Sequence, residues 1–174
     1  FRHAVGFPGE QPGILEDHVV FLRASLDLHQ ATGDQIHLQR AVDVARTIQK
    51  LFSADDGGYY DIAESGVTSL GTPLAKEKPV LENAVLAEAL IVMACLTGNG
   101  EYQAWASEAL ETFEAVVPGS SFRGPRPSRR VEEDEERLFL PAGSAWARAR
   151  QLLAVGPVHL VIVGGAAHPT TAKL

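Results

Sequence analysis

The sequence lacks several features that mark common protein classes. It has a single cysteine, Cys95, so no disulfide can form within the chain. No run approaches the ~18 continuous apolar residues of a membrane-spanning helix, and no secretory signal peptide is visible. We therefore expect a cytoplasmic protein without a membrane partner. The apolar residues around Cys95 predict a buried and inert thiol, because no neighbouring charge in the sequence would lower its pKa.

The sequence is also poor in basic residues, and its histidines do not follow the spacing of metal ligands. Lysine and arginine total 15 against 22 acidic residues, which gives a net charge of -7, and the longest charged run, Glu132–Glu136, is acidic. Because phosphate backbones bind basic surfaces, we expect no nucleic-acid partner. The 6 histidines are scattered. We therefore predict no metal site, and no complete nucleotide-binding motif suggests a cofactor.

Helical periodicity is what the sequence does contain. Leu15, Val19, Leu22 and Leu26 follow the spacing of one helical face, and a second periodic segment runs to Phe52. We predict a helical hairpin over 15–52 and another over 82–117. Between them, tyrosine- and valine-containing segments around a glycine turn predict a rim β-hairpin over 58–70.

The two helical hairpins repeat one pattern. Thr32-Gly33-Asp34 and Thr97-Gly98-Asn99 lie 65 positions apart (98 minus 33), with apolar residues matching at the same shift. Repeated hairpins with short turns bury their apolar faces against one another in solenoids and toroids. The long repeat unit favours a toroid. We therefore predict one mainly all-α domain over 1–174, a partial α/α toroid.

The last third of the sequence differs from the rest in composition. Glycine, proline, arginine and acidic residues mix in a segment that we expect to be an irregular linker over 118–140. A helix over 144–154 and a buried strand over 158–163 make up a final unit at 141–164. Because the chain starts at Phe1 and Thr170-Thr171 resemble the start of a new helix, we expect it to be part of a longer polypeptide.

The order of these motifs resembles a known family. The chain is similar to the C-terminal part of proteins that join a thioredoxin-like domain to a six-hairpin α/α toroid, the spermatogenesis-associated thioredoxin-domain proteins. Their toroid is similar to N-acylglucosamine 2-epimerases and six-hairpin glycosidases. The motifs that carry the resemblance are Leu15-Glu16-Asp17-His18, Ala31-Thr32-Gly33-Asp34, Gly57-Gly58-Tyr59-Tyr60-Asp61, Lys76-Glu77-Lys78-Pro79, Glu82-Asn83-Ala84, Leu96-Thr97-Gly98 and Val161-Ile162-Val163-Gly164.

The resemblance implies a carbohydrate as ligand, but this sequence departs from the family in two places. Leu86-Ala87-Glu88-Ala89 replaces a Pro-Ser-x-Asn stretch, and 123–137 lacks the usual helical pattern. The chain also has no Cys-x-x-Cys motif, so any thiol chemistry would belong to a thioredoxin-like half.

The repeat pairs two carboxylates at equivalent helix starts. Asp17 maps onto Glu82 and His18 onto Asn83 at the shift of 65 (82 minus 17). In a toroid the helix starts of the inner ring surround the central cavity, so Asp17 and Glu82 are candidate catalytic residues for sugar chemistry. The alternative is that these acids stabilise helix N-termini.

Four rim residues complete the candidate site. Aromatic rings beside a carboxylate are typical of sugar subsites, and a lysine suits an anionic group. We therefore include Tyr59, Tyr60, Asp61 and Lys78, with His18 and Asn83, as substrate-binding candidates. The tyrosines equally suit a half-buried surface, and the lysine equally suits solvent.

Two functions follow from these predictions. One is a toroid that binds or processes a carbohydrate in its central cavity, epimerase- or glycosidase-like if it is catalytic. The other is a non-catalytic helical scaffold accessory to a thioredoxin-like domain. An incomplete ring would leave an apolar edge uncovered, so we predict a homo-oligomer formed through that edge, and no activity from this chain alone.

Overall fold

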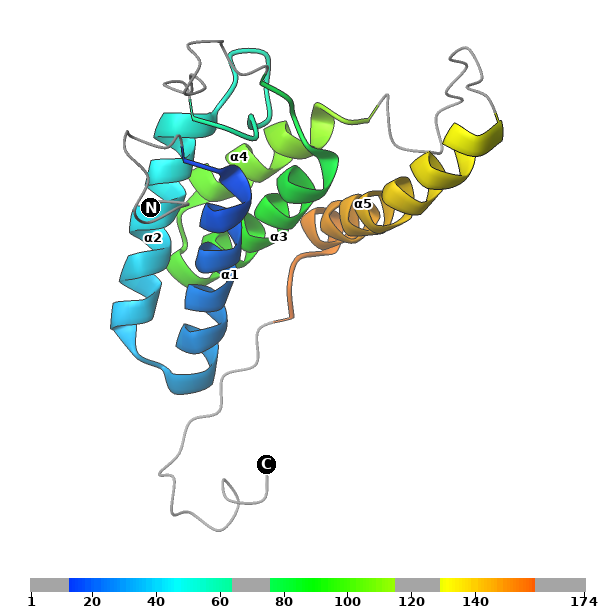
Figure 1. Cartoon of the computed structure of the whole chain (residues 1–174). Coiled ribbons are helices and arrows are strands. Elements are labelled where there is room, and N and C mark those ends of the chain that lie inside the picture. The colour runs from blue at the N-terminus through cyan, green and yellow to red at the C-terminus, as the bar shows by residue number, and fades with distance from the viewer. Residues whose placement is uncertain (1–12, 64–75, 115–128, 159–174) are drawn as a thin grey trace.

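The computed structural model describes residues 13–63, 76–114 and 129–158, with side chains described outside 129–140. These residues form five α-helices, and the described part of the chain contains no β-strand. In chain order (Figure 1) the helices are α1 (Leu15–Thr32), α2 (Gln35–Phe52), α3 (Val80–Thr97), α4 (Gly100–Glu111) and α5 (Arg129–Val155).

The helices form an arc two layers deep. α1 packs against α2 and α3, and α3 packs against α4 and α5. α1, α3 and α5 therefore follow one another along one layer, which we call the inner helices, and α2 and α4 are the outer helices (Figure 1). The predicted all-α class is confirmed, and the arrangement is that of a partial α/α toroid.

The two hairpin turns share the same glycine conformation and the same threonine hydrogen bonds. Gly33 and Gly98 both adopt positive φ angles, 75° and 69°, which glycine reaches without strain. The hydroxyl of Thr32 donates to Leu28 O at 2.7 Å, and the hydroxyl of Thr97 donates to Met93 O at 2.7 Å. Each threonine oxygen also accepts the N–H two residues later, at 3.2 Å in both turns. The sequence repeat is therefore a structural repeat.

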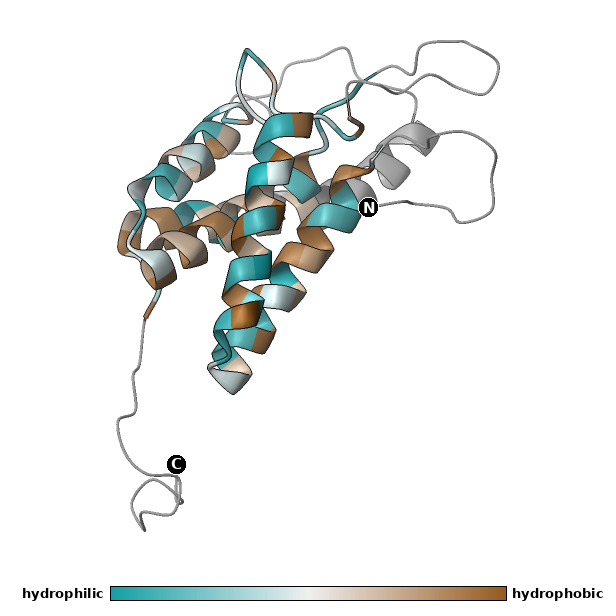
Figure 2. Cartoon of the chain, turned by 90° about the vertical axis from the view of Figure 1, so that its left-hand side faces the viewer, coloured by the Kyte–Doolittle hydropathy of each residue, from teal (hydrophilic) through white to brown (hydrophobic). Residues whose placement is uncertain are grey.

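The core lies where the helices meet. Figure 2 shows hydrophilic and hydrophobic residues mixed along the coloured helices. The largest fully buried side chains come from α1, α2, α3 and α4 and are mostly apolar, with His18 and Asn83 among them: Phe52, Leu15, Leu22, Ile48, Leu86, Leu90, Met93 and Leu110. Tyr102 is also buried and packs edge-on against Trp105, with 5.3 Å between ring centroids.

The central helix is unusually apolar. By length and composition α3 could cross a membrane, with a hydropathy of 1.8 over 18 residues, but half of that stretch is buried inside the fold. A helix covered by α1, α4 and α5 needs an apolar surface on most sides. Its position at the centre of the arc therefore accounts for its composition, and the absence of a membrane partner remains a prediction from sequence.

Two sequence predictions are wrong. Of the linker predicted over 118–140, residues 118–128 lie outside the described residues, and the rest is the first part of α5, because its arginine, glutamate and leucine residues have high helix propensity. Cys95 is exposed rather than buried. It lies in the last turn of α3, where the neighbouring helices cover less of the surface, and Thr97 is exposed as well.

The structure describes only part of the predicted strands. The described part of the rim hairpin, 58–63, forms only isolated antiparallel bridges, Ser53 with Tyr59 and Ile14 with Ile62. Residues 64–70 and the C-terminal strand beyond Val158 lie outside the described residues. The second helical hairpin begins at Val80, and its outer helix ends at Glu111.

Candidate functional site

A tight loop after α2 joins the first turns of α1 and α3. Tyr60 N donates to Phe52 O at 2.8 Å, and Ala54 N donates to Gly58 O at 3.0 Å, which turns the chain back on itself. Gly58 has a φ of +70°, and a Cβ there would lie 3.3 Å from Asn83 Oδ1. Glycine is therefore required both for the backbone conformation and for the close approach of α3.

Asn83 fastens this loop to α3. Its Oδ1 accepts from Tyr59 N at 2.8 Å, and its Nδ2 donates to Tyr59 O at 2.9 Å and to Pro79 O at 2.8 Å. The side chain is 0% exposed. In this structure Asn83 therefore works as a positioning residue for Tyr59, through protein contacts that use both of its polar atoms.

The two tyrosines have different surroundings. The Tyr59 hydroxyl donates to Gln49 Oε1 at 2.7 Å, and burial, with a smaller contribution from Glu108, raises its pKa well above the usual range. The Tyr60 ring is only half-buried and has Lys76 Nζ at 5.0 Å and Lys78 Nζ at 5.5 Å from its centroid. Tyr60 therefore offers the more accessible ring of the pair.

The remaining rim candidates are held by local bonds. Lys78 Nζ donates to Asp56 Oδ1 and to Gly57 O, both at 2.6 Å. The hydrogen bond from Lys78 lowers the pKa of Asp56 below its usual range. Asp61 Oδ1 accepts from Glu77 N at 2.9 Å, and Asp61 O accepts from Leu15 N at 2.8 Å. These contacts tie the start of α1 to the segment before α3.

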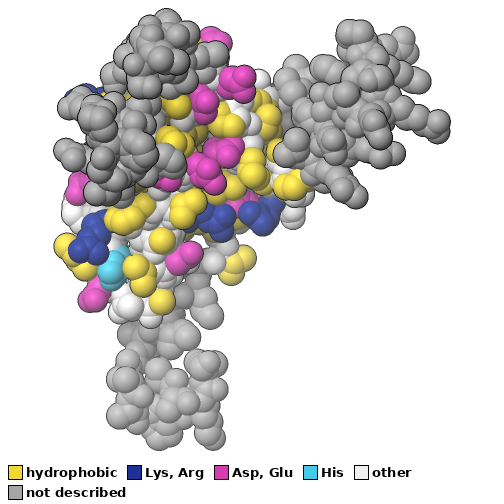
Figure 3. Space-filling model, in the orientation of Figure 1, with side chains coloured by type: hydrophobic (Ala, Val, Ile, Leu, Met, Phe, Trp, Pro, Cys, Tyr) yellow, Lys and Arg dark blue, Asp and Glu magenta, His cyan; other side chains and the backbone are white. Residues whose placement is uncertain are grey.

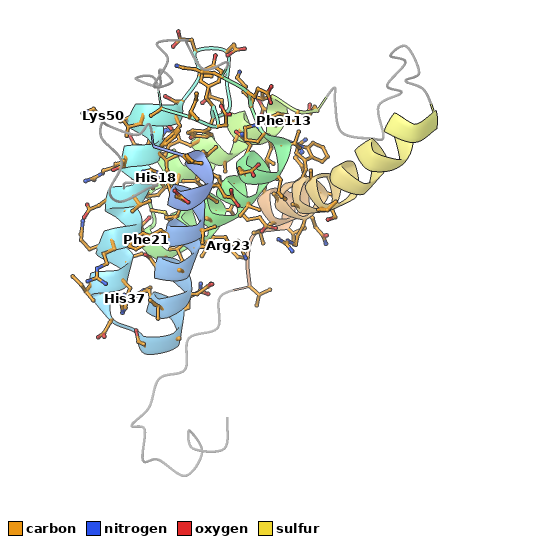
Figure 4. The ribbon with its side chains drawn as sticks, viewed as in Figure 1. His18, Phe21, Arg23, His37, Lys50 and Phe113 are labelled. Carbon is orange, nitrogen blue, oxygen red and sulfur yellow. The ribbon has the colours of Figure 1, made fainter. Side chains whose placement is uncertain are left out.

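His18 lies under the rim, on the α2 side of α1. Its Nδ1 donates to Ile14 O at 2.8 Å, and its ring meets Phe52 edge-on with 5.0 Å between centroids. The side chain is 1% exposed. Figure 4 shows it within the helical layers, whereas Arg23, one turn and a half further along α1, points towards α3 and α5.

Acidification is expected to destabilise the protein through His18. Burial lowers the pKa of this histidine below its usual range, and the bond to the Ile14 carbonyl opposes that effect only in part. The unfolded chain therefore takes up the proton first, and the free energy of unfolding falls as the pH drops below about 6.5. Urea denaturation at several pH values between 7 and 5 measures this slope.

The control for that experiment is another histidine of α1. His18→Gln should flatten the pH dependence, whereas His29→Gln, which changes a half-buried residue near the end of the helix, should preserve it. Equal slopes in the wild type and in His18→Gln would contradict the assignment.

A groove of about 430 Å³ runs between α1 and α3, on the face away from the outer helices. Apolar side chains form much of its wall, and three carboxylates and one arginine border it. We call this the α1–α3 groove; its lining residues are Glu16, Val19, Val20, Arg23, Ala24, Asp27, Leu81, Glu82 and Val85. Figure 3 shows hydrophobic and charged side chains intermixed over this face.

A second hollow of about 290 Å³ continues this face towards α5. It is lined by Arg23, Leu26, Asp27, Gln30, Glu88, Ala89, Val92, Arg148 and Leu152. Arg148 holds Glu88 through two hydrogen bonds, from Nε to Oε1 and from Nη2 to Oε2, the latter at 2.7 Å. This pairing raises the pKa of Arg148. The ion pair joins α5 to α3 at the floor of the hollow.

The two predicted catalytic residues line adjoining hollows. Glu82 lines the α1–α3 groove, whereas Asp17 lines the neighbouring hollow of about 400 Å³ on α1, with Glu16, Val20, Phe21 and Ala24. Glu16, Val20 and Ala24 border both spaces. The carboxylates that share the α1–α3 groove are therefore Glu16, Asp27 and Glu82.

Sequence reasoning missed Arg23, Glu88 and Arg148. The available signal was the repeat, because Arg23 maps onto Glu88 at the shift of 65 (88 minus 23), and both are charged residues near the middle of their helices. In the part of the chain that the structure describes, no group of three or more His, Cys, Asp and Glu side chains could hold a metal ion.

Neither a protein-family profile nor a curated protein sequence matches the chain. Solved structures of six-hairpin α/α toroids are similar to it. Cellobiose 2-epimerase from Spirochaeta thermophila DSM 6192 matches with a TM-score of 0.55 and 20% identity, over 81% of this chain and 39% of the epimerase.

Two family 76 glycoside hydrolases are also similar. The enzyme from a bovine Bacteroides thetaiotaomicron strain gives a TM-score of 0.51 at 18% identity, over 62% of this chain and 23% of the hydrolase. A family 76 mannosidase from B. thetaiotaomicron VPI-5482 gives 0.50 at 16% identity, over 61% and 29%. The likeness at these identities is one of fold, and this chain spans less than two fifths of each enzyme.

Proposed function

We propose that the chain forms part of the wall of an α/α toroid that binds a neutral carbohydrate on its inner helices. The observation that carries this proposal is the hollowed face of α1, α3 and α5, where the α1–α3 groove and the neighbouring hollow take no lining residue from α2 or α4. The similar toroids include a mannosidase and a cellobiose 2-epimerase, whose names supply mannosides and cellobiose as first ligands to test.

The chemistry of the groove suits a neutral sugar. The carboxylates of Glu16, Asp27 and Glu82 can accept hydrogen bonds from hydroxyl groups, while Val20 and Val85 offer apolar surface to the C–H faces of a ring. Three acids against one arginine would repel uronates and sugar phosphates. If the complete protein is catalytic, Glu16 and Glu82 are the pair we propose to act on the sugar, in place of Asp17 and Glu82.

The resemblance of the motifs adds a wider context to this proposal. We place the chain in the C-terminal toroid of a thioredoxin-fused protein, in which the rim loop at Tyr59 and Tyr60 would border the ligand. The alternative role as a non-catalytic scaffold is favoured by one observation: Asn83, His18 and the Glu88–Arg148 pair are engaged within the protein. Ligand binding separates the two functions.

Titration with cellobiose and with mannobiose, followed by two-dimensional NMR, tests the proposal. Amide shifts should concentrate on α1 and α3 around the groove. Glu82→Gln is expected to weaken binding about tenfold, since a hydrogen bond to a charged group contributes about 1.5–3 kcal/mol. Glu111→Gln, on the outer helix α4, is the matched control and should leave binding unchanged. Shifts confined to α2 and α4, or none, would favour the scaffold.

A further inference from the structure

Two residues of α1 belong to both hollows of the inner face. Arg23 and Asp27 line the α1–α3 groove of about 430 Å³ and also the hollow of about 290 Å³ beside α5, which we call the α5 hollow. Because they share these wall residues, the groove and the α5 hollow form one continuous depression along α1. Figure 4 shows Arg23 on the side of α1 that faces α3 and α5. Arg23 therefore lies at the junction of the two hollows.

Arg23 is available to a ligand. The residue is exposed, and it makes no hydrogen bond or ion pair with another described residue. Glu88, in the wall of the α5 hollow, already accepts from Arg148 with both carboxylate oxygens. Asp27, one helical turn after Arg23, is also exposed and forms no ion pair within the described part of the chain. A guanidinium donor and a carboxylate acceptor therefore stand side by side at the junction.

The α5 hollow has the composition of a small-molecule site. Apolar side chains from three helices form part of its wall: Leu26, Ala89, Val92 and Leu152. Gln30 adds an amide whose Nε2 donates to Leu26 O at 3.4 Å, which leaves Oε1 as an acceptor. Because Arg148 neutralises Glu88, this pair adds no net charge. An apolar wall with a few hydrogen-bonding groups suits the C–H faces and hydroxyl groups of a neutral sugar.

The combined depression is longer than one sugar ring. Its α1 wall runs from Glu16 to Gln30, 14 residues apart (30 minus 16), which is about 21 Å along the helix axis. Each hollow alone lies near the lower end of the range of small-molecule sites, about 300–1,000 Å³. One hollow therefore suits one ring, and the two hollows suit a chain of linked rings.

We propose that the ligand is an oligosaccharide of two or more sugars that crosses the junction, with one ring in the α1–α3 groove and the next in the α5 hollow. Arg23 is the specificity-determining residue: its planar guanidinium donates to sugar oxygens on both sides of the glycosidic linkage, and Asp27 accepts from a neighbouring hydroxyl. A monosaccharide reaches only one side of the guanidinium. This inference rests on the proposed function and adds the length of the ligand and the residue that selects for it.

Comparing monosaccharides with disaccharides tests the length of the ligand. Calorimetric titration with glucose, mannose, cellobiose and mannobiose should show a disaccharide bound at least about tenfold more tightly than its own monosaccharide, because only the disaccharide uses both hollows. Equal affinity for the two would overturn this inference and leave the proposed function standing. Binding of none of the four sugars would overturn both.

Two arginine variants test the role of Arg23. Arg23→Gln should weaken disaccharide binding about tenfold and monosaccharide binding much less. Arg46→Gln, at an exposed position of the outer helix α2, is the matched control and should leave both affinities unchanged. A general disturbance of α1 would weaken all sugars alike, so the ratio of the two affinities isolates the contact at the linkage. Equal weakening of both sugars by Arg23→Gln would overturn the assignment.

Two-dimensional NMR locates the second ring. The disaccharide, but not the monosaccharide, should shift the amides of Gln30, Val92 and Leu152, which line the α5 hollow and not the α1–α3 groove. The Nε–H signal of Arg23 should move most strongly with the disaccharide. Disaccharide-induced shifts confined to the groove would show that one hollow is enough, and the inference would then be wrong.

Discussion

Replacing Asn83 with alanine is expected to lower the free energy of unfolding by about 2–5 kcal/mol, because it leaves two buried backbone groups without partners. Among the described residues, Asn83 is the hydrogen-bond partner of both groups. Its Oδ1 accepts from Tyr59 N at 2.8 Å, and its Nδ2 donates to Tyr59 O at 2.9 Å. Tyr59 is itself 4% exposed, so water cannot replace these bonds without opening the loop. Urea denaturation of the wild type and the variant measures the difference.

A matched control comes from the other end of the same hairpin. Asn99 caps α4 by accepting from Glu101 N at 3.0 Å, but at an exposed turn. Asn99→Ala should therefore cost only about 1 kcal/mol. Asn83→Asp keeps the acceptor for Tyr59 N but places a carboxylate beside two carbonyl oxygens, so it should also destabilise strongly. If Asn83→Ala and Asn99→Ala cost the same, the clamp on Tyr59 is not important for stability.

Replacing Arg148 with alanine is expected to loosen α5 and to lower the free energy of unfolding by about 1–3 kcal/mol. Removing one partner of a buried ion pair costs about 3–5 kcal/mol. The lower range applies here because the Arg148 side chain is 63% exposed, although the Glu88 side chain is only 11% exposed. α5 also packs through the small buried residues Ala142, Ala145 and Ala149, and Trp146 Nε1 donates to Leu110 O at 3.0 Å. Hydrogen exchange should accelerate at the α5 amides.

The second ion pair of α5 provides the comparison. Arg150 meets Glu114 at 2.5 Å, but both side chains are partly exposed, at 36% and 49%. Arg150→Ala should cost less than about 1 kcal/mol. The double variant Arg148→Ala/Glu88→Leu, which removes the stranded carboxylate, should recover part of the loss. Unchanged exchange of α5 in Arg148→Ala would show that apolar packing alone holds this helix.

Much of the helical architecture could be predicted from local sequence. The spacing of Leu15, Val19, Leu22 and Leu26 indicates which side of α1 is buried, and the structure buries all four. The turns at Gly33 and Gly98 were visible because a left-handed helix end favours glycine at that position. Each of these features depends on residues a few positions apart, so the sequence contains the relevant information directly.

The prediction of local structure was least successful where two signals competed. Residues 129–140 are charged, which suggested a solvated linker, but the same residues have high helix propensity and form the first part of α5. Cys95 has apolar sequence neighbours, yet it is exposed, because burial depends on which helix covers each side of α3. The local amino-acid composition does not show which helix packs against a given side of α3.

The site shows the same division. The sequence alone determined the hairpins, the 65-residue repeat and the equivalence of Asp17 with Glu82, because these are properties of spacing along the chain. Only the tertiary structure decided that Glu82 lines the α1–α3 groove while Asp17 lines the hollow beside it. It also decided that Asn83 faces Tyr59 and that Glu88 faces Arg148, since these partners are 24 and 60 residues apart. Contacts over such distances depend on how the helices pack.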